Sequence, residues 1–147
     1  MAALTAQPLS TPGKAAAELA GTRSAEWLDA FTEALLRQRS GGELRRILQV
    51  WDLSQSEAAR RFGVSRQSVA KWIAAGVPAS RHEMVADLSA ATDLLVHYLK
   101  SDRIPAVVRR AAGSLRGKSL VDLLESGDHQ GILESCRSMF DFSQAQG

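Results

Sequence analysis

The sequence contains few of the residues that build β-sheets, disulfides or membrane spans. Only 5% of its 147 residues are aromatic, and Cys136 is the single cysteine. A β-sandwich needs more aromatic and β-branched residues, and a lone cysteine cannot form a disulfide within the chain, so a reducing cytoplasm is expected. No run of about 18 apolar residues exists, so no membrane-spanning helix is expected. The apolar content, rich in Ala and Leu, favours packed α-helices.

Signatures of catalysis and of cofactor binding are also missing. His82, His97 and His129 do not cluster with Cys136 or with carboxylates at the spacing of metal ligands. Nothing marks a nucleophile for Ser-His-Asp chemistry. The run Gly117-Lys118-Ser119 lacks the earlier glycine and the preceding strand of a phosphate-binding loop. The sequence therefore predicts a protein that is not an enzyme and that uses no metal or cofactor.

Basic residues are concentrated in the middle of the chain, although the formal net charge is only +2. Residues 1–42 include four basic and four acidic residues, residues 43–118 include 13 basic and 7 acidic, and residues 119–147 include one basic and five acidic. A basic centre fits a surface that faces phosphate groups, as in DNA, but charge alone would also fit an ordinary solvated face.

Apolar residues recur at steps of three and four along most of the chain, a period that predicts α-helices. Ser24 is a candidate N-cap for a first helix that runs to about Arg39, and Gly41-Gly42 is expected to separate it from a second helix over residues 43–51. Later helices are predicted over residues 55–62, 66–75, 81–100, 106–112, 120–125 and 128–140. The apolar faces of the first helix and of residues 84–98 are expected to be core, with a dimer seam as the alternative.

Two short helices joined by a tight turn are indicated in the middle of the chain. The segment Ser54-Gln55-Ser56-Glu57 has the pattern of a capping box, in which Ser54 and Glu57 each bind the other's backbone amide. Gly63 is able to adopt the left-handed conformation that the turn requires, because it has no Cβ. Ser65 then offers an N-cap for the second helix.

Small and large residues in this segment fall where two crossing helices need them. Ala59 leaves room for the second helix to cross closely, and Val69 and Trp72 fill the space between the helices. This spacing resembles that of the helix-turn-helix family of DNA-binding proteins. In that family the N-terminal end of the second helix, here residues 66–75, enters the major groove and reads base edges. An αα-corner with no role in DNA binding is the alternative.

The resemblance implies DNA contacts for particular side chains. Arg66 is expected to bind guanine and Gln67 adenine, while Ala70 contacts a thymine methyl group. Phosphate contacts, which position the protein without reading sequence, are expected from Gln55, Ser65, Ser68 and Lys71. Arg60 and Arg61, on the preceding helix, are weaker candidates for phosphate contacts. Plain solvation is the alternative for each of these side chains.

Several stretches after residue 82 carry a second resemblance. They are residues 84–95, 109–112, 115–124 and 126–128, with a looser match at Ile132, Leu133 and Phe140, and the best piece is Gly-Lys-Ser-Leu-Val-Asp-Leu-Leu at 117–124. This pattern resembles the Xre/MbcA/ParS-type antitoxin family. Proteins of that family place a helix-turn-helix before a small helical module that binds a toxin, so the resemblance implies the same organisation here.

The chain departs from the antitoxin pattern at three places. Leu120 stands where the family usually has proline, Arg109-Arg110 where it has Trp-Leu, and Phe140-Asp141-Phe142 where it has an aromatic residue and glycine. Toxin binding does not require so basic a module. Candidates for a second DNA contact are therefore Arg109, Arg110, Arg116 and Lys118, with a solvated face as the alternative.

Together these patterns predict an all-α protein, with a flexible tail over residues 1–22, a helix-turn-helix domain over 23–80 and a small helical module over 81–147. The module is expected to provide a second DNA contact, dimerisation or partner binding.

The expected function is that of a sequence-specific transcriptional repressor, of the bacterial or phage immunity-repressor type, that binds double-stranded operator DNA in the cytoplasm as a nucleoid-associated protein. The alternative is an antitoxin that neutralises a toxin enzyme through its C-terminal module and represses its own operon. A DNA-end-binding subunit of a recombination system is a third candidate. Besides operator DNA, a second copy of the chain and a toxin protein remain open as partners, and no membrane is expected.

Overall fold

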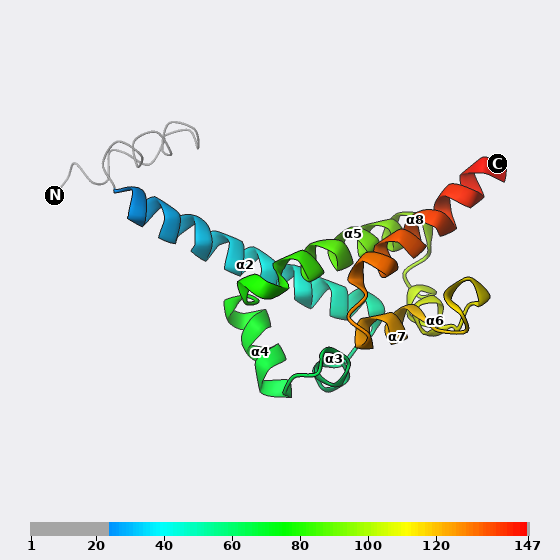
Figure 1. Ribbon diagram of the computed structural model, residues 1–147, viewed down its shortest axis with the longest axis horizontal. Helices are drawn as coiled ribbons and strands as arrows, with labels where there is room; N and C mark the ends of the chain where they lie inside the picture. Colours follow the sequence, from blue (N-terminus) through cyan, green and yellow to red (C-terminus); the bar gives the residue numbers. More distant parts are fainter. Residues whose placement is uncertain (1–23, 147) are drawn as a thin grey trace. The chain divides into compact units, whose positions relative to one another are not determined.

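The computed structural model describes residues 24–146, with the side chains of residues 24–141, and consists there of helices joined by short turns (Figure 1). No strand is formed within this range, where an isolated bridge pairs Ala112 with Lys118. The predicted all-α fold is confirmed. The tail predicted over residues 1–22 lies outside the described residues.

The helices follow the predicted order closely. They are α2 (Ala25–Trp51), α3 (Gln55–Phe62), α4 (Arg66–Ala75), α5 (His82–Tyr98), α6 (Ile104–Arg109), α7 (Leu120–Glu125) and α8 (His129–Gln146), with the short 3-10 helices η2 (Ala79–Arg81) and η3 (Gly113–Leu115). The predicted bounds of α3, α4 and α7 are confirmed, and α6 begins and ends slightly earlier than predicted. None of the helices described is both long and apolar enough to cross a membrane.

The prediction that Gly41-Gly42 ends the first helix is wrong, because α2 continues through both glycines to Trp51. Gly41 is buried where the backbone of α4 crosses α2. A Cβ added at this position would lie 2.6 Å from the carbonyl oxygen of Ile73 and 2.8 Å from that of Trp72. The glycine therefore permits a close helix crossing, and burial of the neighbouring apolar residues outweighs its poor helix propensity.

A second glycine fixes the other side of this crossing. Gly76 ends α4 with a φ of +100°, and a Cβ there would lie 2.4 Å from the carbonyl oxygen of Arg37 on α2. Just after it, the amide of Val77 donates to the hydroxyl of Ser40 over 3.1 Å. The C-terminal end of α4 is thus anchored to the backbone of α2.

The part of α2 up to Leu36 belongs to a compact unit separate from the rest of the chain. Its predicted N-cap is confirmed, since the hydroxyl of Ser24 accepts from the Trp27 amide over 3.2 Å. Its apolar stripe is not core in the described residues: Phe31, Leu35 and Leu36 are 42%, 51% and 48% exposed. The rings of Trp27 and Phe31 stack on each other, with centroids 5.2 Å apart.

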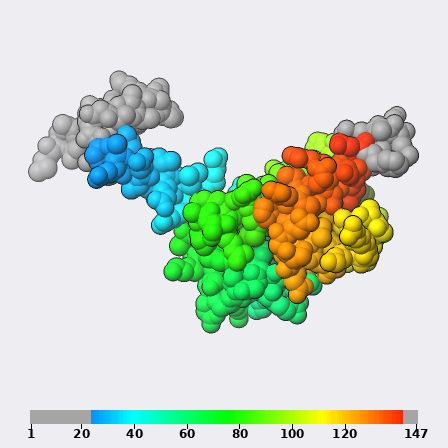
Figure 2. Space-filling model, viewed as in Figure 1, coloured from blue at the N-terminus to red at the C-terminus, as the bar shows by residue number. Residues whose placement is uncertain are grey.

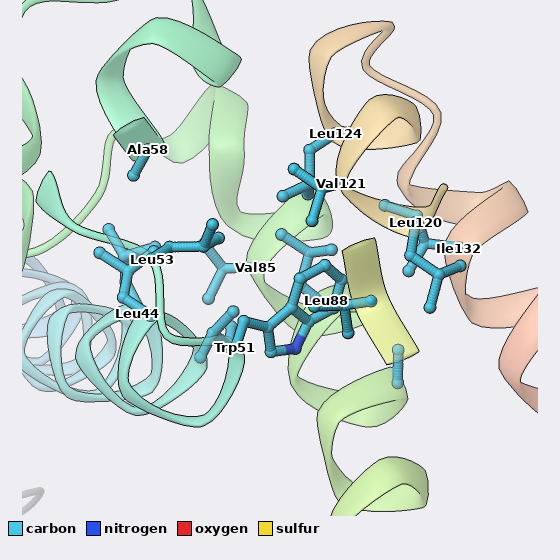
Figure 3. Close-up of a cluster of buried hydrophobic side chains, with 14 of the residues drawn as sticks. Leu44, Trp51, Leu53, Ala58, Val85, Leu88, Leu120, Val121, Leu124 and Ile132 are labelled. Atoms are coloured by element: carbon cyan, nitrogen blue, oxygen red, sulfur yellow. The ribbon is translucent and has the colours of Figure 1, made fainter. Parts of the chain in front are cut away.

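From Arg37 onward the chain forms one unit with one core. Figure 3 shows side chains from both predicted modules converging there, namely Leu44, Trp51, Leu53, Ala58, Val85, Leu88, Leu120, Val121, Leu124 and Ile132. Helices α5 and α8 run side by side, and α3 packs against both α4 and α7 (Figure 1). The division near residue 80 stays a prediction, but the two parts share their apolar core.

Two polar side chains inside this core are paired with each other. The indole Nε1 of Trp51 donates to the hydroxyl of Thr92 over 3.0 Å, and that hydroxyl donates to the Leu88 carbonyl over 2.6 Å. Cys136 is fully buried in α8, and burial raises the pKa of its thiol to about 11. At neutral pH this thiol is therefore protonated and packs as a small apolar group.

Two alanine substitutions test the helix crossing, because Gly41 and Gly42 are neighbours in one helix but meet different surroundings. We expect Gly41→Ala to lower the free energy of unfolding by about 1–3 kcal/mol, since its Cβ would collide with backbone oxygens. Gly42→Ala should raise it by about 0.5–1 kcal/mol, because alanine is the better helix former. No atom lies within 4 Å of the added Cβ at Gly42. Urea unfolding measures both changes, and an equal effect of the two would contradict the close crossing.

Candidate functional site

Helices α3 and α4 form the predicted pair around a tight turn. Gly63 has φ 69° and ψ 32°, the left-handed conformation expected for it, and its amide donates to the carbonyls of Ala59 and Arg60. The amide of Val64 also donates to the Ala59 carbonyl, over 2.9 Å. These bonds satisfy two carbonyls in the last turn of α3, and α4 begins after three intervening residues.

Both predicted N-caps are confirmed. The hydroxyl of Ser54 accepts from the Glu57 amide over 3.0 Å, and that of Ser65 accepts from the Ser68 amide over 3.1 Å. The capping box is only half formed, because the carboxylate of Glu57 binds the guanidinium of Arg109. A tertiary partner has therefore replaced the local one.

A complete capping box occurs where none was predicted, at the start of α7. The hydroxyl of Ser119 accepts from the Asp122 amide over 3.1 Å, and the carboxylate of Asp122 accepts from the Ser119 amide over 2.9 Å. The bond from the Ser119 amide to the carboxylate is the main cause of the lowered pKa of Asp122, and the Ser119 hydroxyl and the charge of Arg61 lower it further. The signal in the sequence was the spacing Ser-x-x-Asp before an apolar run.

The contact between α3 and α4 is made by apolar residues, and the residues at its centre are small. Ala58, Ala59 and Val69 are buried, and the ring of Phe62 lies 6.4 Å from that of Trp72. Beyond the pair, the guanidinium of Arg81 lies 5.0 Å above the Trp72 ring and donates to the Phe62 carbonyl over 3.4 Å. The orientation of α4 against α3 is therefore fixed by packing on the side that faces the core.

The opposite face of α4 is open to solvent. The side chains predicted to read bases are all exposed, namely Arg66, Gln67 and Ala70. Lys71 and Ser65 are exposed as well, while Gln55 and Ser68 are half-buried. In Figure 2 this part of the chain, coloured green, forms part of the molecular surface. The face needed for DNA contact is accessible, and the roles of its residues stay predictions.

The two arginines of α3 differ in their surroundings. The side chain of Arg60 is 70% exposed and lies 3.7 Å from the Glu57 carboxylate. The side chain of Arg61 is only 19% exposed and is bound by Glu125 at 2.9 Å and Asp122 at 3.5 Å, both on α7. Arg61 thus connects α3 to α7. From the sequence it was considered only as a weaker candidate for a phosphate contact, and this role was not predicted.

Arg109 also has a partner within the protein. Its guanidinium donates to both carboxylate oxygens of Glu57, over 2.9 and 3.2 Å, and to the carbonyl of Asp52 over 2.8 Å. The hydrogen bonding between the two side chains is the main cause of the lowered pKa of Glu57 and of the raised pKa of Arg109. The pairing was not predictable from local sequence, because 52 positions separate the two residues.

The other three candidates for a second DNA contact lie in or beside one loop. Arg110, Arg116 and Lys118 are exposed, and the loop turns at Arg116-Gly117, where both residues have positive φ. This loop, coloured yellow, stands at the surface beside α7 and α8 in Figure 2. Its role in DNA binding stays a prediction.

A groove lies between this loop and α8, with a cavity of about 730 Å³. Its walls come from α6, η3, α7 and α8, and its apolar lining includes Val107, Leu115, Leu120 and Met139. Arg110 and Glu134 add opposite charges to the lining. Such a mixture of apolar walls and few charges fits a surface that binds another molecule.

The histidines are occupied by protein contacts or by ring stacking. His82 Nε2 lies 3.1 Å from the Val77 carbonyl, and His129 Nδ1 lies 2.6 Å from the Asp87 carboxylate. His97 packs edge-on against Tyr98. Within residues 24–146, no group of three His, Cys, Asp or Glu is placed to hold a metal ion.

Comparison with known proteins finds a likeness in fold. No protein-family model and no curated protein matches the chain. A chain of the crystal structure of the M.tuberculosis MbcT-MbcA toxin-antitoxin complex matches with a TM-score of 0.55 and 22% identity, over 67% of this chain and 91% of that chain. At this identity the likeness concerns the fold, and it agrees with the antitoxin resemblance of the sequence.

The Glu57–Arg109 pair leads to a pH-dependent prediction. Because the pKa of Glu57 is lowered, its ionised form stabilises the folded state above the ordinary carboxyl value of 4.5, and that stabilisation is lost as pH falls through the lowered value. We expect Glu57→Gln to lower the free energy of unfolding at pH 7 by at most about 1 kcal/mol, as for partly exposed pairs.

Urea unfolding of the wild type and of Glu57→Gln across the pH range measures this difference, which should shrink below pH 4.5. Glu134→Gln, which removes the same charge in the groove, serves as the control and should not reproduce the effect. A difference between the wild type and Glu57→Gln that persists unchanged in acid would contradict the ion pair.

Proposed function

We propose that this protein is the antitoxin of a toxin–antitoxin pair. Its C-terminal half binds and neutralises a toxin protein, and helices α3 and α4 bind the operator DNA of its own operon. The observation that carries the proposal is the fold shared with a chain of a toxin-antitoxin complex, over 91% of that chain. The sequence resemblance of residues 84–128 to antitoxins of the Xre/MbcA/ParS type points to the antitoxin side of such a pair.

The surface of the C-terminal half supports a protein partner. The groove beside η3 combines apolar walls with Arg110 and Glu134, as the core and rim of a protein interface do. Apolar side chains also emerge on α5 and α8, where Val96 and Met139 are 48% and 38% exposed. A partner that covers this region buries apolar area, which is the main source of binding free energy.

Charge supports DNA as the ligand of α3 and α4. Between Glu57 and Glu83 the sequence contains no acidic residue, while it contains Arg60, Arg61, Arg66, Lys71 and Arg81. Most of these lie on or beside the exposed face of the pair, and Arg66 begins the helix that would enter the groove. Arg60 and Arg61 lie against carboxylates, but Arg66 and Lys71 are exposed on α4, which itself contains no acidic residue. Exposed cations of this kind attract phosphates and release their counterions.

A transcriptional repressor without a toxin partner is the second candidate. It uses the same DNA interface, and the exposed, acid-free face of α4 favours it as much as it favours an autoregulating antitoxin. The two functions differ in one respect, because only the antitoxin needs the C-terminal half to bind a toxin. The fold likeness makes the antitoxin the better supported of the two.

Co-expression tests the antitoxin function. The chain is produced together with the protein encoded by the adjacent gene, whose expression alone is expected to arrest growth. We expect the wild type to restore growth and to co-purify with that protein. A double variant, Arg66→Ala with Lys71→Ala, is the matched control, since it should still rescue growth but no longer repress the operon. Absence of rescue by a chain that still binds DNA would leave the repressor function instead.

Substitutions on α4 test the DNA interface. We expect Arg66→Ala and Gln67→Ala each to reduce the preference for the operator over other sequences by about 5- to 150-fold, which corresponds to about 1–3 kcal/mol per base contact. Lys71→Ala should weaken binding to all sequences and lower the slope of log K against log salt by about 1. Titration of labelled duplexes at several salt concentrations measures both quantities.

Arg137→Ala provides the control for these titrations, because Arg137 is an exposed cation on α8, far along the chain from α4. It should change neither the preference nor the slope. If the Arg66, Gln67 and Lys71 variants all lost the same affinity on every sequence, α4 would not read bases.

A further inference from the structure

A basic stretch without acidic residues lies directly before α7. Between residues 102 and 122 the sequence contains no acidic residue and five cations, namely Arg103, Arg109, Arg110, Arg116 and Lys118. The guanidinium of Arg109 is already bound by Glu57. The last three cations are exposed, and none of them forms a salt bridge within the described part of the chain. We call Arg110, Arg116 and Lys118 the loop cations.

The loop that carries these cations is closed by its own backbone. The amide of Ala112 donates to the Lys118 carbonyl over 3.0 Å, and the amide of Gly117 donates to the Ala112 carbonyl over 2.9 Å. Arg116 has φ 59° and ψ 39°, the left-handed conformation. A residue with a Cβ adopts this conformation at some cost, which glycine does not have. An arginine therefore stands at the turn of the loop, where the backbone alone favours glycine.

The loop is held in place relative to α3 and α4. Arg109, directly before it, binds Glu57 of α3, and α7, directly after it, packs against α3 and binds Arg61. In Figure 1, α4, α3, α7 and the loop follow one another along one side of this unit. Because both basic surfaces belong to one compact unit, a duplex bound at α4 is brought close to the loop at a high effective concentration.

The groove proposed for a protein partner uses other side chains of this loop. Its lining includes Leu115 and, of the loop cations, Arg110. Arg116 and Lys118 do not line it. Two of the three loop cations thus lie outside the apolar surface that a protein partner would cover. Positive charge beside an apolar groove, and not inside it, fits a polyanion better than the core of a protein interface.

We propose that the loop cations form a second DNA-binding site, which contacts phosphates of the same duplex beyond the base pairs that α4 would read. This inference rests on the proposed function and extends its DNA interface into the C-terminal half. Arginine and lysine bind phosphates through charged hydrogen bonds. Such contacts raise the affinity for every sequence and read no base, because phosphates are alike in all sequences. The loop therefore adds length to the DNA site but no sequence preference.

The salt dependence of DNA binding by the full-length protein tests the second site. The probe is a labelled duplex of about 30 base pairs and unrelated sequence, titrated at several salt concentrations, because phosphate contacts do not require the operator. We expect Arg116→Gly and Lys118→Gln each to lower the slope of log K against log salt by about 1, since each removes one phosphate contact.

The fold of these variants can be checked separately. Arg116→Gly should keep or raise the urea concentration at which the protein unfolds, because glycine suits the left-handed backbone at this position. Lys118→Gln keeps most of the length of the side chain and removes its charge. Weaker DNA binding by a variant that unfolds no earlier than the wild type therefore reports a lost contact and not a damaged fold.

Two other variants calibrate the slope. Arg137→Ala removes an exposed cation of α8, outside the loop, and should keep the wild-type slope. It separates a lost contact from a change in net charge. Lys71→Ala reports a phosphate contact at α4, the first site of the proposed function. Combined with Arg116→Gly, it should lower the slope by about 2, because separate contacts release separate counterions.

Four results overturn the inference, and they differ in what they say about the proposed function. If the loop variants keep the wild-type slope while Lys71→Ala lowers it, DNA binding by α4 stands and the second site is absent. If the loop variants keep the slope but no longer co-purify with the protein of the adjacent gene, the loop belongs to the protein interface. If Arg137→Ala lowers the slope equally, net charge is the cause. If the wild type binds no duplex, the DNA part of the proposed function fails together with the second site.

Discussion

The close crossing of α2 and α4 is the constraint on which the position of the exposed face of α4 depends. Gly41 and Gly76 allow the backbones of the two helices to approach to a distance that no Cβ would permit. One end of α4 is therefore pinned, while its N-terminal end, beginning at Arg66, stays exposed. In the proposed function α4 is the recognition helix, and it needs this asymmetry, because such a helix must present its first turn to DNA while its orientation stays fixed.

Pinning one end of α4 does not by itself set the position of α3, which lies between α4 and α7. The ion pairs Glu57–Arg109 and Arg61–Glu125, with the apolar contact of Ala58 with the shared core, supply that second fixation. Because these ion pairs come from α6 and α7, the pair of helices α3 and α4 is completed by residues that lie 52 and 64 positions beyond their partners on α3. A fragment that ended near residue 80 would lose both partners of α3.

Local features of the fold were predictable from the sequence because their causes are local. The serine caps at Ser54 and Ser65 and the left-handed Gly63 depend on residues within one turn of helix, and the structure has all three. The predicted break between two helices at Gly41-Gly42 was wrong because its cause is not local. Gly41-Gly42 has the composition of a helix stop, but at Gly41 a distant backbone makes glycine necessary inside a helix. Periodicity carries no information about which backbone crosses a helix.

The candidate site shows the same limit in its charges. From the sequence, Glu57 could either complete a capping box or form a salt bridge. In the structure it binds Arg109, which lies far along the chain. The exposed face of α4 was predictable because helical periodicity separates it from Val69 and Trp72. The sequence did not predict which basic residues bind another helix, since Arg60 and Arg61 are neighbours and only Arg61 binds α7.

The face of α4 and the groove, the two proposed binding surfaces, lie over a single core, and this restricts what variants can reveal about function. Trp51, Leu88 and Ile132 lie in the same buried cluster, so a substitution among them weakens the face of α4 and the groove together. Loss of both proposed activities from such a variant does not assign a role to the substituted residue, because a partly unfolded chain loses every surface at once. Substitution of an exposed residue such as Arg66 or Arg110 changes one surface and leaves the core intact. Arg109 and Arg61 are a third kind of residue, because their ion pairs join α3 to the C-terminal half without filling the core, and substitution of either one tests how the two halves are held together.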